Sequence, residues 1–315
     1  MNPPRVGIVG ARRARQGLGP FVIRDLLGAG ADIPCLLTTS EASRDAALRV
    51  LRENHQREAR GYLDLGEMLD RESLDALAVL SPAESHAGHL EAAARAGLHV
   101  LCEKPLVWGI PDLAERAASL VRMFEARALI LWENCQWPYA LPGLEALHSG
   151  VLATPPRHFE MLLQPVSRGA QRIGDAIPHP LSLLQRLAPG PASLEQVSFS
   201  SRDPEAVALD VRFTWCTPSA SVDVCVHLEA GMRQPRETWV AVDGRRADRV
   251  VSPGDYQLSL QDAGRSVALA DPLTLLIADF VSELISRSQR SLAGEIRERM
   301  RLLAELAGAY AREIR

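Results

Sequence analysis

Apolar runs alternate with helix-patterned segments along the first 135 residues of the chain. The apolar runs predict strands near residues 5–10, 32–39, 74–80, 98–102 and 128–132. Their near-continuous hydrophobicity is typical of strands that are buried on both faces of a sheet. Helical patterns fill the intervals, near residues 21–27, 43–60, 63–69, 90–96 and 112–126. This alternation predicts an α/β domain built on a doubly wound parallel sheet.

The second half of the chain has a different pattern, in which apolar and polar positions alternate. Strands are expected near residues 158–164, 197–200, 206–215, 220–229 and 238–242, with a hairpin turn at Asp243-Gly244. Few crossover helices separate them, so we predict an α+β domain with a mainly antiparallel sheet. Two closing helices follow at 272–285 and 292–313, and we interpret Arg297, Arg299 and Arg301 as part of a solvated face. The predicted domains are residues 1–135 and 136–315.

Composition limits the classes of partner that the chain can have. It has 315 residues and a net charge of −4, with basic residues dispersed among acidic ones, which argues against nucleic acid and anionic membranes as partners. It has no 18-residue apolar run, and its first residues lead straight into a strand, so we expect a cytoplasmic protein. The five cysteines are scattered and include no CxxC or Cys/His cluster with metal spacing, so we expect thiols and no metal site.

Lys104 stands out because it is the only lysine in the chain; the other 34 of the 35 basic residues are arginine. It comes just after the strand predicted at 98–102, at the edge where open α/β sheets bind their ligands. A partly desolvated lysine can give up a proton, whereas arginine cannot. We therefore interpret Lys104 as a catalytic residue, the alternative being a lysine left by chance on a surface loop.

The segments 81–86 and 97–105, which contain Ser81-Pro82, His86 and Glu103-Lys104-Pro105, resemble the Gfo/Idh/MocA oxidoreductases, the group of glucose-fructose oxidoreductase and inositol dehydrogenase. The resemblance covers the N-terminal half well, and in the C-terminal half it is limited to a few short segments. It implies a Rossmann NAD(P)-binding domain followed by a domain for substrate binding and oligomerisation. It also implies that Ser81, Pro82, His86 and Glu103 lie beside the cofactor with Lys104, and that Glu103 holds the lysine. An exposed loop histidine is the alternative for His86.

The first strand ends at Gly10, before a loop rich in arginine and a helix, which indicates a phosphate-binding turn. The usual Gly-x-Gly-x-x-Gly pattern is broken, because Arg12 stands where the second glycine is expected. We interpret the loop as an expanded one, in which Gly10 supports the turn and Arg12 or Arg13 reaches a phosphate. A solvated arginine loop is the alternative.

The end of the second strand bears on the choice of cofactor. A carboxylate there accepts a hydrogen bond from the ribose of NAD, whereas a hydroxyl with an arginine accommodates the 2′-phosphate of NADP. Ser40 and Arg44 point to NADP, while Glu41 keeps NAD open. Arg44 has an alternative reading as a helix-surface residue.

In the second half, Asp175 and His179 are four residues apart, which places them on one face of a helical turn, where the carboxylate can orient the imidazole. The spacing also resembles the family's Asp-x-Gly-x-His motif, in which this pair stands opposite the lysine; here Ile177 replaces the glycine and Ser182 an acidic residue. A helix-capping aspartate beside an uninvolved histidine is the alternative.

The family resemblance also implies that residues 133–138 form the crossover into the second domain, where Gln136 and Trp137 would contact the substrate. The arginine common at this crossover is missing, which argues against an anionic substrate. The second domain's sheet would pair subunits into a homo-oligomer if its outer face is apolar, as members of the family often do.

Together with these features, the family resemblance implies an oxidoreductase that moves a hydride between a nicotinamide, of NADP or NAD, and a carbinol or ketone carbon of a sugar, cyclitol or similar polyol. Lys104 and His179 are the candidate proton donors, and Asp175 fixes the histidine tautomer. Two alternatives stay open: a non-catalytic nucleotide-binding sensor of the same fold, and a reductase of aldehydes or imines outside carbohydrate chemistry.

Overall fold

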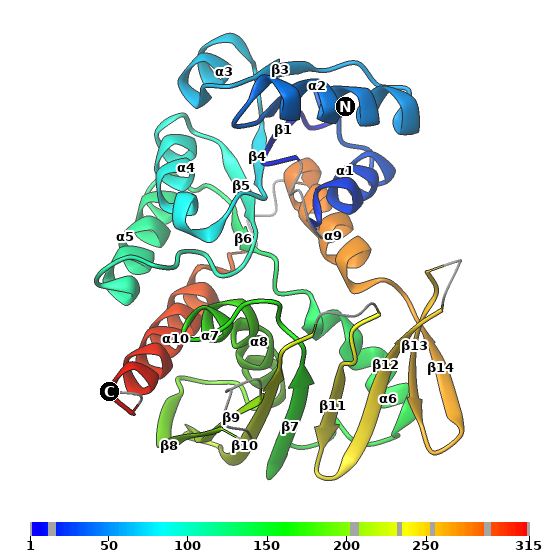
Figure 1. Ribbon diagram of the computed structural model, residues 1–315, viewed down its shortest axis with the longest axis vertical. Helices are drawn as coiled ribbons and strands as arrows, with labels where there is room; N and C mark the ends of the chain where they lie inside the picture. Colours follow the sequence, from blue (N-terminus) through cyan, green and yellow to red (C-terminus); the bar gives the residue numbers. More distant parts are fainter. Residues whose placement is uncertain are drawn as a thin grey trace. The chain divides into compact units, whose positions relative to one another are not determined.

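The computed structural model describes residues 2–11, 17–201, 208–231, 235–252, 256–286 and 291–313. The chain divides into two compact units, which are described one at a time (Figure 1). The N-terminal unit comprises Met1–Asn134 and Leu273–Arg297, and the C-terminal unit comprises Cys135–Pro272 and Glu298–Arg315. The division therefore differs from the predicted one at the end of the chain, where one closing helix joins the first unit.

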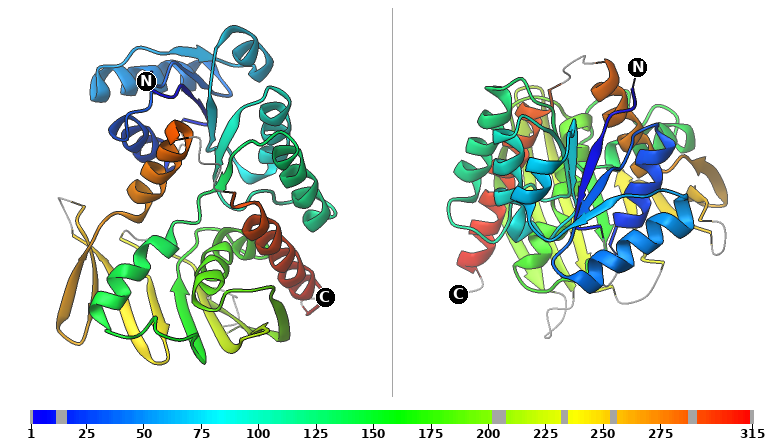
Figure 2. Two further views of the ribbon diagram at one scale, coloured as in Figure 1. Left: turned by 180° about the vertical axis from the view of Figure 1, so that it is seen from behind. Right: turned by 90° about the horizontal axis from the view of Figure 1, so that it is seen from above.

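Within the described residues, the N-terminal unit has a six-stranded parallel sheet in the order β3-β2-β1-β4-β5-β6, which confirms the predicted doubly wound sheet. The helices α1, α2, α4 and α5 lie on both sides of this sheet (Figure 2, right). The elements are β1 (Val6–Val9), α1 (Gly19–Gly28), β2 (Cys35–Leu37), α2 (Glu41–His55), β3 (Arg60–Tyr62), α3 (Leu65–Arg71), β4 (Ala76–Val79), α4 (Ala83–Arg95), β5 (His99–Cys102), α5 (Leu113–Glu125) and β6 (Leu131–Glu133).

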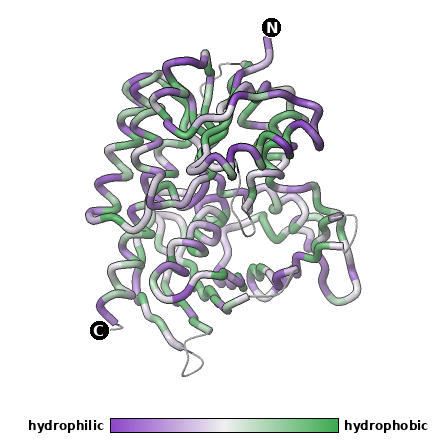
Figure 3. Tube along the Cα trace, turned by 45° about the horizontal axis from the view of Figure 1, so that its top comes forward, coloured by the Kyte–Doolittle hydropathy of each residue, from purple (hydrophilic) through white to green (hydrophobic). Residues whose placement is uncertain are grey.

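Burial of apolar side chains on both faces explains why these short runs form strands. Every residue of β1, β2, β4 and β6 is buried, and green stretches of high hydropathy run through the middle of this unit (Figure 3). The helix α9 (Pro272–Ser286) brings further apolar side chains to this core. Its Phe280 is fully buried and lies against Trp132 of β6, with 5.9 Å between the ring centroids.

The C-terminal unit has an eight-stranded sheet in the order β14-β13-β12-β11-β7-β10-β9-β8, counted over the described residues. All neighbours are antiparallel except β7 and β10, which are parallel, so the predicted α+β domain is confirmed. Its elements are η1 (Trp137–Ala140), α6 (Leu141–Leu147), β7 (His158–Leu163), α7 (Gln171–Ala176), α8 (Pro178–Leu187), β8 (Ser193–Ser201), β9 (Ala208–Thr217), β10 (Ala220–Glu229), β11 (Trp239–Val242), β12 (Arg245–Val251), β13 (Leu258–Asp262), β14 (Arg265–Leu269) and α10 (Ala293–Glu313).

The two faces of this sheet differ in polarity. One face packs against α6, α8 and α10 (Figure 2, left). The same face carries the buried side chains of β9 and β10, such as Val211, Phe213 and Val224. The next residues along each strand point to the opposite face, which carries Arg212, Asp223 and other charged side chains. Pairing of subunits into a homo-oligomer through this sheet stays a prediction.

Three local features differ from the sequence-based expectation. The helix predicted to reach residue 60 ends at His55, and residues 60–62 form the edge strand β3, which was missed. Arg299, expected on a solvated face, is only 4% exposed, and its guanidinium donates a hydrogen bond of 2.5 Å to the side chain of Gln185. The prediction for Arg299 was wrong because its helix position faces α8 rather than solvent.

Among the described residues, no helix combines the length and the hydrophobicity that crossing a membrane requires.

Candidate active site

The carboxyl edge of the parallel sheet gathers most of the predicted site residues. The strand order reverses between β1 and β4, which pair along their whole length. Such a switch point opens a crevice beyond the strand ends, where open α/β sheets bind ligands. Gly10 follows β1 at this point, and Ser81 and Pro82 follow β4.

Position 10 requires glycine for two reasons, its positive φ and the close approach of neighbouring backbone. Its φ is +86°, and a Cβ added to it would lie 2.7 Å from the backbone nitrogen of Ser81. A Cβ on Gly19, at the start of α1, would overlap the carbonyl oxygen of Ala11. The chain thus passes closely around the end of β1, as a phosphate-binding turn requires. Arg12 and Arg13 lie outside the described residues.

Ser40, at the start of α2, and Arg44, in its first turns, follow β2, and the preference for NADP rests on these two residues. Ser40 is the N-cap of α2, and its hydroxyl accepts a hydrogen bond from the backbone N–H of Ser43 at 3.3 Å. Arg44 packs its methylenes against Gly61, and its Nε donates to Asp45 at 3.0 Å. Both residues have a local structural contact, so their predicted contact with a 2′-phosphate stays a prediction.

His86 lies close to the ends of β4 and β5, and its ring contacts backbone carbonyl groups there. It is 1% exposed, and its ring nitrogens lie 2.8 Å from the carbonyl oxygen of Ser81 and 3.0 Å from that of Pro105. The imidazole ring therefore lies between the end of β4 and the segment that follows β5. Its predicted place beside the cofactor stays a prediction.

His89, to which the sequence assigned no role, contacts the same strand end. Its Nδ1 lies 3.1 Å from the hydroxyl of Ser81, which also accepts a hydrogen bond from Ser85 at 2.8 Å. Burial lowers the pKa of His89, and the neighbouring His86 lowers it further. A neutral imidazole is therefore favoured here, so one of its nitrogens can accept a hydrogen bond from Ser81.

Glu103 and Lys104 are held in place by the strands on either side. The backbone N–H of Glu103 donates to Val79 at 2.8 Å, and that of Asn134 donates to Cys102 at 2.8 Å, so the ladder continues past the strand ends. The side-chain amide of Asn134 donates to the carboxylate of Glu103. Lys104 follows in a half-buried position.

Sequence reasoning missed two members of this frame, Glu133 and Asn134. Glu133 is 3% exposed, and its carboxylate accepts a hydrogen bond of 2.7 Å from the backbone N–H of Leu106. Burial raises the pKa of the Cys102 thiol, and the charge of Glu133 raises it further. The signal was available, because Glu133 ends the last parallel strand and Asn134 follows it, just as Cys102 ends the strand beside it and Glu103 follows.

In the C-terminal unit, Asp175 and His179 lie at the junction of α7 and α8. Ile177 ends one helix and begins the next with α-helical backbone angles, so the helical path is continuous and the two side chains share one face. Asp175 accepts a hydrogen bond from Gln171 at 3.3 Å, and the carbonyl oxygen of His179 accepts one from the hydroxyl of Ser182 at 2.7 Å. The glycine replaced by Ile177 is thus not needed for the helical geometry.

Arg236 is a further residue that the sequence did not single out. Burial lowers the pKa of its guanidinium, and the charge of Asp175 opposes that shift. A cation therefore lies near the acidic member of the pair.

Gln136 and Trp137 precede α6 at the start of the C-terminal unit. Trp137 is 7% exposed and lies among the apolar side chains of Leu144, Leu183 and Val240. Its indole belongs to the core of that unit, and its predicted contact with a substrate stays a prediction. Gln136, which is half-buried, comes immediately before the helical turn η1.

The carboxyl edge of the sheet in the N-terminal unit fits a dinucleotide. The close approach of Gly10 to Ser81 leaves backbone rather than side chain at the switch point, and the N-terminus of α1 follows it. Gly10, Ser81 and the Glu103-Lys104 pair are the described residues that would hold such a group. The sheet edge thus supplies a backbone cradle, a hydroxyl and one ammonium.

Residues 4–135 match the model of an oxidoreductase family with an NAD-binding Rossmann fold. A D-apiose dehydrogenase of Paraburkholderia graminis is 29% identical over 244 residues, which cover 72% of this chain and 64% of that protein. A dTDP-3,4-didehydro-2,6-dideoxy-alpha-D-glucose 3-reductase of Actinomadura kijaniata is 37% identical over 135 residues, which cover 42% of this chain and 36% of the reductase. The chain thus spans less than two thirds of the length of each relative.

Similarity to a solved structure extends over both units. The structure of KijD10, a 3-ketoreductase from Actinomadura kijaniata in complex with NADP and TDP-benzene, matches with a TM-score of 0.71 and 20% identity, over 98% of each chain. At this identity the match establishes the fold of the whole chain.

Proposed function

We propose that the chain is an NAD(P)-dependent enzyme acting on a carbinol or ketone carbon of a sugar, cyclitol or similar polyol, because residues 4–135 match the model of the Gfo/Idh/MocA family of oxidoreductases with an NAD-binding Rossmann fold. The observation that carries the proposal is the position of Lys104. The only lysine of the chain follows β5 at the cofactor-binding edge, beside a carboxylate that Asn134 holds. The names of the two relatives, a sugar dehydrogenase and a nucleotide-sugar reductase, support the substrate class.

A bound nicotinamide would supply or accept the hydride, and the chain must handle the proton. When a carbonyl carbon gains a hydride, its oxygen needs a proton, which a positioned ammonium or imidazolium can donate. Lys104 is the first candidate. His179 is the second, and Asp175, on the same helical face, would fix its tautomer. In the reverse reaction the same groups take the proton from the carbinol.

We further propose NADP as the preferred cofactor, from Ser40 and Arg44 at the end of β2. Glu41 beside them is the residue that would favour NAD. Thermal melting with NADPH and with NADH compares the two directly. A larger stabilisation by NADPH, which shrinks to that of NADH in an Arg44→Ala variant, supports the assignment.

The proposal is tested with Lys104→Met and Lys104→Arg variants of the full chain. We expect both to keep the melting shift caused by the reduced cofactor and to lose about 10²–10⁴-fold in turnover, because arginine keeps the charge but cannot give up a proton. Turnover is followed by the absorbance of the reduced cofactor with a panel of sugars, cyclitols and nucleotide sugars.

The alternatives give different results. Unchanged turnover in Lys104→Met would discard the mechanism. Cofactor binding with no turnover of any polyol or nucleotide sugar would favour a sensor, and turnover of simple aldehydes or imines alone would favour the non-carbohydrate reductase. Because Lys104 is the only lysine, an amine-directed reagent followed by mass spectrometry also reports whether the cofactor protects this one side chain.

A further inference from the structure

The hydroxyl groups of Ser85 and Ser81 and the imidazole of His89 form a chain of hydrogen bonds at the end of β4. Oγ of Ser85 lies 2.8 Å from Oγ of Ser81, which lies 3.1 Å from Nδ1 of His89. Ser85 and His89 are four residues apart on α4 and therefore share one face of the helix. His89 has no role in the function proposed above.

Every proton of this chain has an acceptor in either of two directions. In the first direction Ser85 donates to Ser81, and Ser81 donates to Nδ1 of a neutral His89. In the second, a protonated Nδ1 donates to Ser81, Ser81 donates to Ser85, and Ser85 donates to the carbonyl oxygen of Pro82, which lies 2.7 Å from its Oγ. The same carbonyl also accepts from the backbone N–H of Ser85 at 2.9 Å, so it is satisfied in both directions. Because hydroxyl groups rotate to suit their partners, the chain can reverse.

His89 favours the first direction at neutral pH. Burial lowers the pKa of His89 below its ordinary value of 6.5, and the nearby His86 lowers it further. The ring is half-buried and Nδ1 is the nitrogen that contacts Ser81, so a proton received there can be released to water from the other nitrogen, Nε2. An imidazole that is neutral at rest and releases a proton easily is suited to proton transfer.

The other charged groups near this part of α4 form pairs of their own. The helix packs against β4, β5 and α5. The titratable side chains of these elements are Glu84, His86, Glu91 and Arg95 of α4, His99 and Cys102 of β5, and Glu115, Arg116, Arg122 and Glu125 of α5. Glu91 pairs with Arg95 and Arg116, and Glu115 pairs with Arg122.

The oxygen of Ser81 is the end of the chain that a ligand can reach. A hydroxyl oxygen has one proton and two lone pairs, so with Ser85 and His89 as partners Ser81 keeps one lone pair for a hydroxyl group of a ligand. Ser81 lies at the switch point between β1 and β4, where its backbone nitrogen would be 2.7 Å from a Cβ on Gly10. The chain therefore begins where open α/β sheets bind dinucleotides.

We propose that Ser81 and His89 form a proton relay between a ligand hydroxyl at the end of β4 and solvent, with Ser85 as the residue that positions the oxygen of Ser81. This role rests on the oxidoreductase function proposed above, because oxidation of a carbinol releases a proton and reduction of a ketone consumes one.

Each proton that leaves one atom of the relay is bound by the next. The ligand O–H bond breaks as its proton binds Oγ of Ser81, and the original Oγ–H proton of Ser81 binds Nδ1 of His89. The imidazolium then loses its Nε2 proton to water, which leaves the chain in its second direction. The ligand oxygen takes up the proton that the carbinol releases or, where it is the carbinol oxygen itself, becomes the carbonyl oxygen. Reduction runs the same steps backwards.

The first test is NMR of the ring nitrogens of His89 in the full chain without ligand, with the His89→Gln variant to identify the signals. At neutral pH we expect a neutral ring with its proton on Nε2, and Ser81→Ala should shift the Nδ1 signal because it removes the hydrogen bond. A proton on Nδ1 at this pH would mean that His89 cannot take one from Ser81. That result would overturn the relay whether or not the chain turns over a polyol.

Added ligands identify the source of the hydroxyl group. A change in the Nδ1 signal with NADPH alone assigns the hydroxyl to the dinucleotide, and a change that needs a polyol as well assigns it to the polyol. If NADPH and a polyol that is turned over leave the signal unchanged, the relay is overturned. If NADPH does not raise the melting temperature, it is the proposed function that fails.

Turnover separates a relay from contacts that only support the fold. Ser81→Ala, His89→Gln and the double variant should lose the same factor, about 10²-fold, because the loss of either member interrupts the transfer. Added imidazole should restore part of the rate of His89→Gln and none of the rate of Ser81→Ala. Losses that multiply in the double variant would indicate two independent contacts and would overturn the relay.

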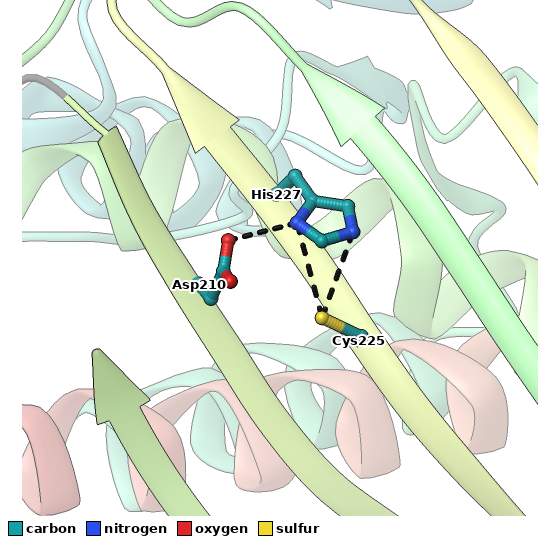
Figure 4. A group of neighbouring side chains, drawn as sticks. All are labelled: Asp210, Cys225 and His227. Carbon is teal, nitrogen blue, oxygen red and sulfur yellow. Dashed lines mark hydrogen bonds and ion pairs between the residues drawn. The ribbon is translucent and has the colours of Figure 1, made fainter. Parts of the chain in front are cut away.

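His227→Gln is the matched control. His227 is also a half-buried histidine with a hydrogen-bonded Nδ1, but its partner is a carboxylate oxygen of Asp210 at 2.8 Å, on the sheet of the C-terminal unit (Figure 4). We expect this variant to keep its turnover and to show no response to imidazole. An equal response of His89→Gln and His227→Gln to imidazole would contradict the relay, and circular dichroism checks that each variant is folded.

Discussion

At the residue scale, Gly10 and Gly97 allow conformational strain to be separated from a requirement for close approach. Both have positive φ, +86° and +76°, but a Cβ on Gly97 would meet no atom within 4 Å. Gly97→Ala should therefore cost only backbone strain, about 1–2 kcal/mol of the free energy of unfolding. Gly10→Ala must also displace the backbone of Ser81, so we expect a larger loss of stability.

Chemical unfolding of both variants, with and without NADPH, tests this prediction. Gly97→Ala should keep the stabilisation by the reduced cofactor, whereas Gly10→Ala should lose most of it. Equal responses of the two variants would show that the end of β1 does not approach the cofactor.

Single residues were also where the sequence was most informative. Lys104 could be placed because its position depends only on β5 and on the rule that ligands bind at strand carboxyl ends. The local contacts of His86 could not be foreseen, because its partners, the carbonyl oxygens of Ser81 and Pro105, depend on how two loops meet. The chemical type of a residue can be read from the sequence, but the groups that contact its side chain cannot.

At the element scale, Glu72 links the edge strand β3 to its neighbours. It is 7% exposed and accepts hydrogen bonds of 2.7 Å from Arg60 and from Tyr62. Burial raises the pKa of this carboxyl, but those hydrogen bonds outweigh burial, and the net pKa lies below its usual value. The strand Arg60–Tyr62 was missed because three residues with a charge and a glycine have no strand pattern of their own; contacts with Glu72 and pairing with β2 hold it.

The lowered pKa gives Glu72 a defined pH dependence. The folded protein holds the ionised form, so its contribution to stability is complete above the unfolded-state pKa of about 4.5 and is lost as the pH falls below it. We expect Glu72→Gln to lower the free energy of unfolding by about 2 kcal/mol at pH 7. The difference from the unchanged protein should shrink below pH 4.5.

Urea unfolding at several pH values measures that difference. Glu58→Gln is the control, because Glu58 pairs with Arg52 on an exposed surface and its loss should change stability little. A Glu72→Gln effect that is independent of pH down to 3 would show that the contacts of the charged form are not what stabilises β3.

At the scale of the whole molecule, the fold classes could be predicted but not the path of the chain between units. The alternation of strands and helices indicated a parallel sheet, and the later run of strands indicated an antiparallel one. The sequence did not show that α9 returns to the first unit, because an amphipathic helix pattern does not identify its partner.

The return of α9 predicts that the end of the chain stabilises the N-terminal unit. Phe280 is fully buried against Trp132, and its neighbours Leu276, Ile277 and Val281 are buried in the same unit. Phe280→Ala removes a large apolar side chain from a closely packed core, which costs about 3–5 kcal/mol. Leu275→Ala, on the same helix but 37% exposed, is the control and should cost about 0.5 kcal/mol or less.

If the N-terminal unit depends on α9, Phe280→Ala should lower the melting transition that NADPH raises, and added NADPH should recover part of the loss. Equal melting of the two variants would mean that α9 adds nothing to the stability of the N-terminal unit, and that residues 1–134 hold their sheet without it.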